Sequence, residues 1–186
     1  VCSSDLMLAR LSVDEQGNLL YSGVPGTGGF SDVKRGDWYA PYVAFAKRYG
    51  IANGYLDGTF RPEQPVSRAE LVKLIASYFT VEGGTSPFPD VPDGHWAAEV
   101  VSFAAEEGWV SGYPDGTFRP DAPVSRAEAV KILNHALDRR AGERAAALPF
   151  TDVEKGHWAC DEIREAAVSH IYRKSGEGET WLTYER

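Results

Sequence analysis

Apolar residues between Trp38 and Leu137 recur with a helical period. After Trp38 they keep this spacing until Gly50, and after Trp96 they do so until Gly108. The positions concerned are Tyr42, Val43, Phe45, Ala46 and Tyr49 in the first segment, and Val100, Val101, Phe103 and Ala104 in the second. Glycine often ends a helix because it adopts the left-handed conformation without strain. The pattern therefore predicts two helices that end at these glycines.

Two more segments show the spacing i, i+3, i+4, i+7 that is typical of a helix with one buried face. Their apolar residues are Leu71, Val72, Leu74, Ile75, Tyr78 and Phe79, and then Ala129, Val130, Ile132, Leu133, Ala136 and Leu137. We expect these second helices to form the common core.

The chain contains a duplication. A shift of 58 residues aligns 30–79 with 88–137, and 26 of the 50 positions are identical without a gap. The shared elements are F-x-D-V, a following Trp, and GY-x-DGTFRP-x-x-PVSRAE-x-VK. A third copy starts at Phe150 with FTDVEKGHWA, and then diverges into HIYRKSGEGETW. Such self-similarity marks a repeated structural unit. A single unit of about 50 residues buries too little surface to be stable alone, so the units are expected to pack on one another.

These boundaries predict repeats at 30–82 and 88–140 and a divergent or truncated repeat at 150–186. Residues 1–29 are expected to be a hairpin or the end of an upstream domain, followed by a glycine-rich linker. Residues 1–6 lack a Met and resemble a translated sequencing adapter, so we expect them to be foreign to the protein. The two cysteines, Cys2 and Cys160, do not indicate a disulfide framework.

Charge excludes some classes of partner. Lys and Arg total 19 against 27 Asp and Glu, which gives a formal net charge of -8. A broad nucleic-acid surface is therefore not expected. No apolar run approaches the roughly 20 residues that span a bilayer, so membrane insertion is not expected either.

The repeated PVSRAE element has the pattern of a capping box at a helix start. Ser67 with Glu70, and Ser125 with Glu128, have the Ser-x-x-Glu spacing in which each side chain bonds the other residue's backbone N–H. This structural role is the favoured one for these four residues.

The arginine within the element needs another explanation. Arg68 and Arg126 occupy the first helical position, where a cation opposes the helix dipole by about 0.3 to 1 kcal/mol. One explanation is an ion pair with Asp32 or Asp90 of the F-x-D-V element. The other is a bound anion, since a helix N-terminus with a guanidinium suits a carboxylate or phosphate. The residues alone leave both open.

The remaining repeated positions have a structural and a functional interpretation. The Asp-Gly pair of GY-x-DGTF is typical of a turn, and it lacks the further oxygen ligands of a calcium loop, so no metal site is expected. Trp38, Trp96 and Trp158 are expected to be half-buried packing residues or, alternatively, the apolar wall of a sugar site. No catalytic constellation and no cofactor motif emerges, so we do not expect an enzyme.

Together, F-x-D-V, the following Trp, GY-x-DGTFRP and V-S-R-A-E resemble the S-layer homology (SLH) module, over about residues 30–172. The resemblance implies a mostly α fold, with three helix-loop-helix repeats in a pseudo-threefold arrangement around a central helical bundle and ligand grooves between neighbouring repeats. It also implies an extracellular protein at the cell wall or S-layer. Its function would be non-covalent anchoring of upstream cargo by binding anionic, pyruvylated secondary cell-wall polysaccharide.

The same resemblance implies roles for individual residues. Arg68 and Arg126 would contact the carboxylate, Ser67 and Ser125 would order the helix start, and Glu70 and Glu128 would cap it or bond a sugar hydroxyl. The facing walls would be lined by Asp32, Asp90, Asp152, Trp38, Trp96 and Trp158. Gly54 and Gly112 would let backbone approach the ligand. The third repeat lacks the arginine element, so at most two sites are expected to be competent, with binding that weakens in salt.

Two other functions remain open at this point. The repeats could be a self-assembly or protein-interaction module of a surface layer. They could also be the anchor of a secreted hydrolase whose catalytic domain lies upstream.

Overall fold

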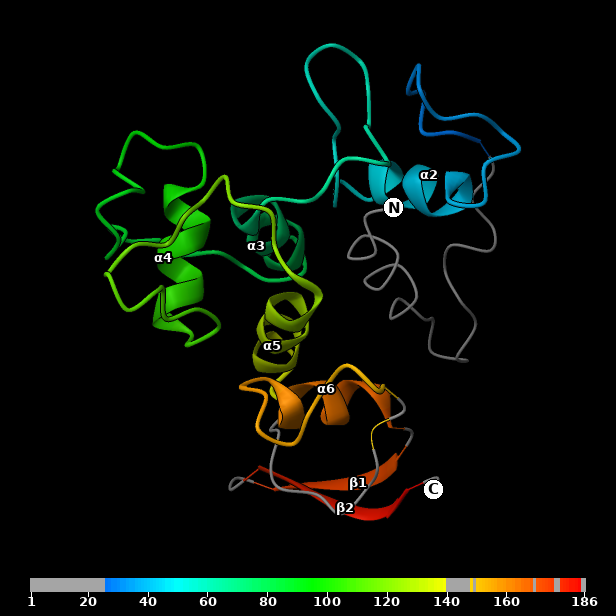
Figure 1. The fold of residues 1–186 in the computed structure, drawn as a ribbon. Helices are drawn as coiled ribbons and strands as arrows, with labels where there is room; N and C mark the ends of the chain where they lie inside the picture. The colour runs from blue at the N-terminus through cyan, green and yellow to red at the C-terminus, as the bar shows by residue number, and fades with distance from the viewer. Residues whose placement is uncertain (1–25, 140–147, 149, 169, 176–177, 185–186) are drawn as a thin grey trace. The chain divides into compact units, whose positions relative to one another are not determined.

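The computed structural model describes residues 26–139, 148, 150–168, 170–175 and 178–184. The expectations for Cys2, for residues 1–6 and for most of the segment 1–29 lie outside these ranges. Within them the fold is mostly helical, as the sequence predicts. Its elements are α2 (Ala40–Arg48), α3 (Arg68–Ala76), α4 (Ala98–Glu106), α5 (Arg126–Ala136), α6 (Cys160–Ala167), β1 (His170–Ser175) and β2 (Gly178–Tyr184) (Figure 1). The threefold arrangement of repeats stays a prediction.

The chain divides into two compact units that do not coincide with the repeats. Unit 1 consists of Val1–Glu82 with Arg119–Pro123, and unit 2 consists of Gly83–Phe118 with Val124–Arg186. The segment 119–123 therefore belongs to the second repeat in sequence but to the first unit in space.

The first helix of each complete repeat ends as the sequence predicts. Gly50 follows α2 with φ of 70°, and Gly108 follows α4 with φ of 73°. The N–H of Gly50 donates to Lys47 O at 3.3 Å, and the N–H of Ile51 donates to Ala46 O at 2.9 Å. This pair of bonds is the Schellman motif, which satisfies carbonyls that the helix leaves without partners.

The second helices are shorter than the apolar pattern predicts. Because α3 ends at Ala76, Tyr78 and Phe79 lie beyond it and are 44% and 40% exposed, so the expectation that they face the core is wrong. The buried face of α3 consists of Ala69, Leu71, Val72, Leu74, Ile75 and Ala76.

The core of the first repeat joins two of the repeated elements, F-x-D-V and DGTF. Phe30, Val33, Ala40 and Val43 form a buried cluster against which Phe60 packs, with the Phe30 and Phe60 ring centroids 5.2 Å apart. In the second repeat Phe88 and Phe118 repeat this contact at 5.4 Å. The phenylalanines of the two turns thus pack against the first element of their repeats.

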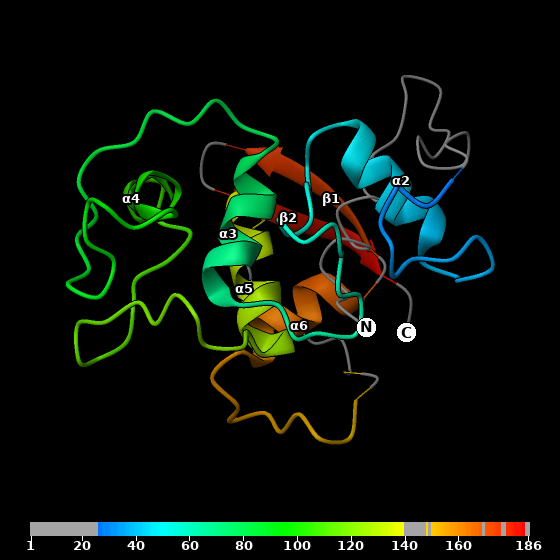
Figure 2. The same cartoon turned by 90° about the horizontal axis from the view of Figure 1, so that it is seen from above.

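The third repeat keeps its first helix and then changes structure. After α6 the chain forms β1 and β2, an antiparallel hairpin in which His170 pairs with Tyr184 and Ser175 pairs with Gly178. Within unit 2, α5 and α6 lie side by side in both ribbon views (Figures 1 and 2). A hairpin therefore stands where the other copies have the DGTF turn and a second helix.

Candidate functional site

Both PVSRAE elements form the predicted capping box. The N–H of Glu70 donates to Ser67 Oγ at 3.2 Å, and the N–H of Ser67 donates to Glu70 Oε2 at 2.8 Å. At α5 the corresponding bonds of Ser125 and Glu128 measure 3.2 and 2.9 Å. Ser and Glu thus accept hydrogen bonds from backbone N–H groups at the two helix starts. These N–H groups have no partner within the helix itself.

A tyrosine holds each capping glutamate from the other side. Tyr55 donates its hydroxyl to Glu70 Oε1 at 2.8 Å, and Tyr113 donates to Glu128 Oε1 at 2.6 Å. The tyrosine comes from the GY-x-DGTF turn, so this bond fixes the turn against the helix start. Sequence reasoning missed this role, although the invariant spacing of Tyr and Glu in both copies was a signal for it.

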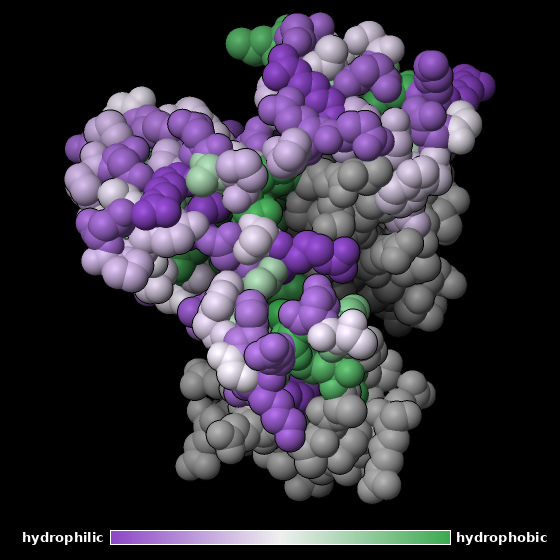
Figure 3. Space-filling view, viewed as in Figure 1, coloured by the Kyte–Doolittle hydropathy of each residue, from purple (hydrophilic) through white to green (hydrophobic). Residues whose placement is uncertain are grey.

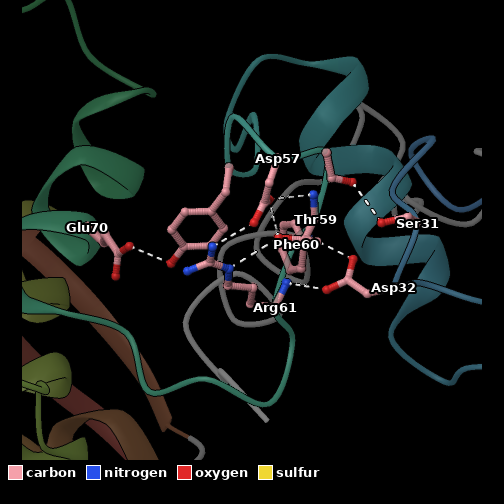
Figure 4. Close-up of polar contacts among 9 residues, drawn as sticks. Ser31, Asp32, Asp57, Thr59, Phe60, Arg61 and Glu70 are labelled. Carbon is pink, nitrogen blue, oxygen red and sulfur yellow. Dashed lines mark hydrogen bonds and ion pairs between the residues drawn. The ribbon is translucent and has the colours of Figure 1, made fainter.

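The turn itself is locked by its aspartate. Asp57 accepts from Thr59 N at 3.0 Å, from Thr59 Oγ1 at 2.6 Å and from Arg61 at 2.7 Å (Figure 4). The hydrogen bond from the Thr59 hydroxyl, followed by that from Arg61, lowers the pKa of Asp57 from 3.8 to about 2. The Arg61 guanidinium also lies 4.0 Å from the centroid of the Tyr55 ring. The predicted turn is thus confirmed.

The aspartate of F-x-D-V binds backbone rather than standing free. Asp32 accepts from Phe60 N at 2.8 Å and from Arg61 N at 2.7 Å (Figure 4). Asp90 accepts from Phe118 N at 2.8 Å in the same way. In the third repeat Asp152 is exposed. Both oxygens of Asp32 therefore accept hydrogen bonds that hold the fold together, and a ligand role for it stays a prediction.

Gly54 and Gly112 are required by packing inside the protein. Their φ angles are 71° and 70°, which side chains rarely tolerate. A Cβ on Gly54 would lie 2.3 Å from Phe30 Cε1, and one on Gly112 would lie 2.5 Å from Phe88 Cε1. The close phenylalanine and the positive φ are sufficient to explain both glycines, and the approach of a ligand to their backbone stays a prediction.

The two arginines of the repeated element differ sharply in exposure. Arg68 is 6% exposed, whereas Arg126 is exposed to solvent. Their local sequences are the same, so the difference arises from what surrounds each helix start. Arg126 is the arginine of the pair that a ligand from solvent can reach.

In unit 1 the start of α3 is covered by the segment 119–123. The N–H of Arg68 donates to Ala122 O and the N–H of Ala69 donates to Pro120 O, each at 3.0 Å. Ser67 and Pro123 also form an antiparallel β-bridge. The free N–H groups of this helix start are thereby used within the protein.

The three tryptophans are each about half exposed. Trp38, Trp96 and Trp158 are 56%, 53% and 59% exposed, so nearly half of each side chain is covered and the rest faces solvent. Both the packing role and the sugar contact therefore stay predictions. In unit 2 the ammonium of Lys131, from α5, lies 5.9 Å from the centroid of the Trp158 ring. Lys131 was not singled out from the sequence for this contact, although its place in PVSRAE-x-VK was a signal. An exposed aromatic ring with a cation beside it can bind an acidic sugar in two ways. The ring contacts the apolar face of the sugar, and the cation pairs with its acidic group.

The helices α5 and α6 of unit 2 are joined by a polar cluster. Asn134 Nδ2 donates to Glu162 Oε2 at 2.7 Å, and His135 Nε2 lies 3.4 Å from Glu162 Oε1. The other ring nitrogen of His135 lies 3.0 Å from Gly108 O. The bond to Glu162 raises the pKa of His135. Burial alone would raise the pKa of Glu162, but the bonds from His135 and Asn134 outweigh it and lower that pKa.

Among the described residues, no group of three or more His, Cys, Asp and Glu side chains is placed to hold a metal ion. In the same part of the chain, no helix has both the length and the apolar character needed to cross a membrane. Hydrophilic residues cover most of the coloured surface that Figure 3 shows.

Comparison with known proteins agrees with the repeat pattern. A family model described as the S-layer homology domain matches residues 29–72 and 87–130. The chain is 35% identical over 156 residues to a cellulosome-anchoring protein of Acetivibrio thermocellus, covering 81% of this chain and 35% of that protein. It is 34% identical over 165 residues to cell surface glycoprotein 1 of the same organism, covering 82% of this chain and 7% of the relative.

A third relative is the exoglucanase XynX of Acetivibrio thermocellus, 36% identical over 121 residues that make up 60% of this chain and 11% of that protein. The chain thus spans about a third or less of the length of these relatives. The two family-model matches fall on the two copies that contain the capping box, the Asp-Gly turn and the partly exposed tryptophan. The chain carries two tandem S-layer homology domains and belongs to the S-layer homology family.

Proposed function

We propose that this chain anchors an exported protein to the bacterial cell wall by binding an anionic, pyruvylated wall polysaccharide. The family supports a place at the cell surface, and the names of the relatives include a cellulosome-anchoring protein and a cell surface glycoprotein. The observation that carries the ligand chemistry is in unit 2. There a single helix, α5, begins with the exposed Arg126 and places Lys131 over the exposed ring of Trp158.

The electrostatics of α5 favour a carboxylate at this place. The N-terminus of a helix carries a partial positive charge of about half a proton charge, and Arg126 adds a full one. An arginine there is costly without a counter-charge, so a bound anion would relieve repulsion as well as accept hydrogen bonds. A pyruvyl ketal supplies one carboxylate on a sugar, which fits a guanidinium better than a polymer of neutral sugars would.

Exposed aromatic rings support the saccharide part of the ligand. Tryptophan presents a large flat apolar face, and sugar rings have apolar faces of similar size. Three such rings stand at the same point of the repeat, before α2, α4 and α6. We assign Trp158 with Lys131 to the site on α5, and leave Trp38 and Trp96 as further contacts of a long polymer.

Retention on isolated walls tests this proposal. The chain is expected to sediment with walls that carry pyruvylated polymer and to stay in solution with walls from which the ketal has been removed. Arg126→Ala should release most of the protein, because a charge-assisted contact to a carboxylate contributes about 1.5 to 3 kcal/mol. Trp158→Ala should release it as well, through loss of the sugar contact.

The matched control is Arg48→Ala, which removes an exposed arginine at the end of α2 and changes net charge equally. Retention should also weaken with rising salt, since the protein has a net charge of -8 and depends on local positive potential to hold a polyanion. If Arg126→Ala and Arg48→Ala bind walls equally well, the arginine does not contact the ligand and the proposal is wrong.

A further inference from the structure

Within unit 2, two contacts join α5 to the third copy, and they lie one helical turn apart. The ammonium of Lys131 lies 5.9 Å from the centroid of the Trp158 ring. Four positions later on both sides, His135 Nε2 lies 3.4 Å from Glu162 Oε1. Side chains four residues apart share one face of a helix, so His135 is the neighbour of Lys131 on α5. The polar pair is therefore next to the candidate sugar contact.

The backbone around Trp158 is tied to the start of α6. The N–H of Ala159 donates to His157 Nδ1 at 3.2 Å, and the N–H of Cys160 donates to His157 O at 2.9 Å. The N–H of Ile163 donates to Ala159 O at 2.9 Å, and Ala159 is fully buried. The place of the Trp158 ring therefore follows the place of α6.

The side chain that fixes α6 against α5 is Glu162. Asn134 Nδ2 donates to Glu162 O at 3.0 Å and to Glu162 Oε2 at 2.7 Å, and His135 faces the other carboxylate oxygen. Only 16% of the Glu162 side chain is exposed, and a charge covered to this extent costs stability unless it is paired. The other copies have Val100 and Tyr42 at this position, so the acidic group is particular to the third copy. Asn134, His135 and Glu162 are called the junction cluster below.

The ring of His135 stands between two oxygen acceptors from different elements. Its second nitrogen lies 3.0 Å from Gly108 O, just after α4. A neutral imidazole has a single N–H, so one of the two contacts then places a lone pair against an oxygen, whereas the protonated ring donates to both. The bond to Glu162 of α6 raises the pKa of His135, burial lowers it, the Gly108 carbonyl raises it, and Lys131 of α5 lowers it. The net effect is a raised pKa.

We infer that the junction cluster positions the Trp158 ring against Lys131, and that the site on α5 therefore binds its acidic saccharide more tightly when His135 is protonated. The inference rests on the proposed function, because the saccharide is the ligand proposed there. When the ring loses its proton, one of its two bonds is lost, and α6 with Trp158 is held less firmly to α5.

The direction of the pH dependence follows from the two titrating groups. The contribution of His135 is complete below the unfolded value of 6.5 and is lost as pH rises through the raised folded value. Glu162, whose pKa is lowered from 4.5, stays ionised above that value. A carboxylate on the ligand is ionised throughout this range as well. Binding should therefore weaken as pH rises from about 6 to about 8.5.

Retention on walls with pyruvylated polymer, measured at both pH values, tests the inference. All chains carry His157→Asn, because a titrating ring beside Trp158 would complicate the comparison. The chain without further changes should bind about two- to fivefold more weakly at the higher pH, which is the worth of a partly exposed ion pair. His135→Gln and Glu162→Gln should bind at the weaker level at both pH values.

The matched control is His95→Asn, which changes the histidine at the corresponding turn of the second copy and should keep the pH dependence. Circular dichroism checks that the variants keep their helices. If His135→Gln loses as much retention between the two pH values as the chain that keeps His135, the inference is wrong.

A second measurement needs no ligand. The indole N–H resonance of Trp158 is identified as the one that disappears in Trp158→Phe. In the His157→Asn background it should shift as pH rises from about 6 to about 8.5, and His135→Gln should abolish the shift. A Trp158 resonance that does not move, or that moves equally in both chains, overturns the positioning role.

The two measurements separate this inference from the proposed function. If Arg126→Ala releases the protein from walls but His135→Gln leaves the pH profile unchanged, only the role of the junction cluster is wrong. If Arg126→Ala and Arg48→Ala bind walls equally well, the proposed function fails and the pH-dependent saccharide binding falls with it. The indole resonance then decides by itself whether the cluster positions the ring.

Discussion

The two complete repeats and the third copy begin with the same F-x-D-V element, yet that element is buried in the first two and open in the third. Phe30 and Phe88 are 7% and 8% exposed, whereas Phe150 is 42% exposed. Asp32 and Asp90 bind backbone N–H groups that follow the DGTF turn, and Asp152 is exposed. The third copy lacks that turn. The comparison teaches that the side chains of F-x-D-V become buried only in the repeats that also contain the DGTF turn, against which they pack.

The tryptophan that follows F-x-D-V, unlike the residues of that element, has a similar exposure in all three copies. Trp158 is as exposed as Trp38 and Trp96, although its repeat has lost the turn and the second helix. Its exposure therefore does not depend on a DGTF turn or a second helix in its own repeat. A ring that stays partly exposed in all three copies meets the requirement of the proposed sugar contact.

The largest expected difference in stability between the complete repeats and the third copy concerns the phenylalanine of F-x-D-V. Phe88→Ala should cost about 3 to 5 kcal/mol of unfolding free energy, because it removes a buried ring and leaves a cavity beside Phe118. Phe150→Ala should cost less than about 1 kcal/mol because that ring is exposed in part. Urea denaturation of both variants measures the two values. Equal losses would mean that Phe150 is packed as tightly as its counterpart.

A smaller difference is expected for the aspartates. Asp32→Ala leaves the N–H groups of Phe60 and Arg61 without their acceptor, which should cost about 1 to 3 kcal/mol. Asp152→Ala should change stability by no more than about 0.5 kcal/mol, as is usual for an exposed side chain. Thermal unfolding of the two variants compares them. A loss at Asp152 similar to that at Asp32 would show that the third copy has an equivalent partner for its carboxylate.

The smallest effect is a pH dependence that only the contact between the second and third copies should show. Both ring nitrogens of His135 face oxygen acceptors, so the protonated ring is the form that fits, in agreement with its raised pKa. This contribution is complete below the unfolded value of 6.5 and is lost as pH rises through the raised folded value. The contribution of Glu162 is present above its unfolded value of 4.5 and is lost as pH falls through the lowered folded value.

The pair should therefore stabilise the junction of α5 and α6 between about pH 4.5 and 6.5, by less than about 1 kcal/mol because the imidazole is partly exposed. Lys131 lowers the pKa of His135 slightly and reduces the effect. Melting temperatures of the unchanged chain and of His135→Gln, taken across pH 5 to 8, measure it. A difference between them that does not depend on pH would contradict the prediction.

Much of the local structure follows from short-range patterns. The Ser-x-x-Glu spacing predicts both capping boxes, and the glycines at 50 and 108 predict two helix ends, because these features involve residues a few positions apart. The Asp-Gly turn is predictable for the same reason. The failures concern Tyr78 and Phe79, whose helical spacing continues after α3 has ended. Periodicity alone does not say where a helix loses its packing partner.

The candidate site was predictable only in part. Residue types and repeat positions point to the arginines and tryptophans, but the sequence assigns Arg68 and Arg126 the same environment because their neighbours are identical. It also leaves the role of Tyr55 and Tyr113 unassigned, since their bonds to the capping glutamates join positions 15 residues apart.

By itself the sequence determined the repeat, the helix starts and ends, the turns and the family, since each depends on contacts that neighbouring residues make or on a pattern that recurs along the chain. The tertiary structure alone decided that Arg68 is buried and Arg126 exposed, that Asp32 binds backbone whereas Asp152 is exposed, and that the segment 119–123 covers the start of α3. The physical reason is that burial and the pairing of backbone groups depend on segments far apart in the chain, which two identical stretches of sequence need not share.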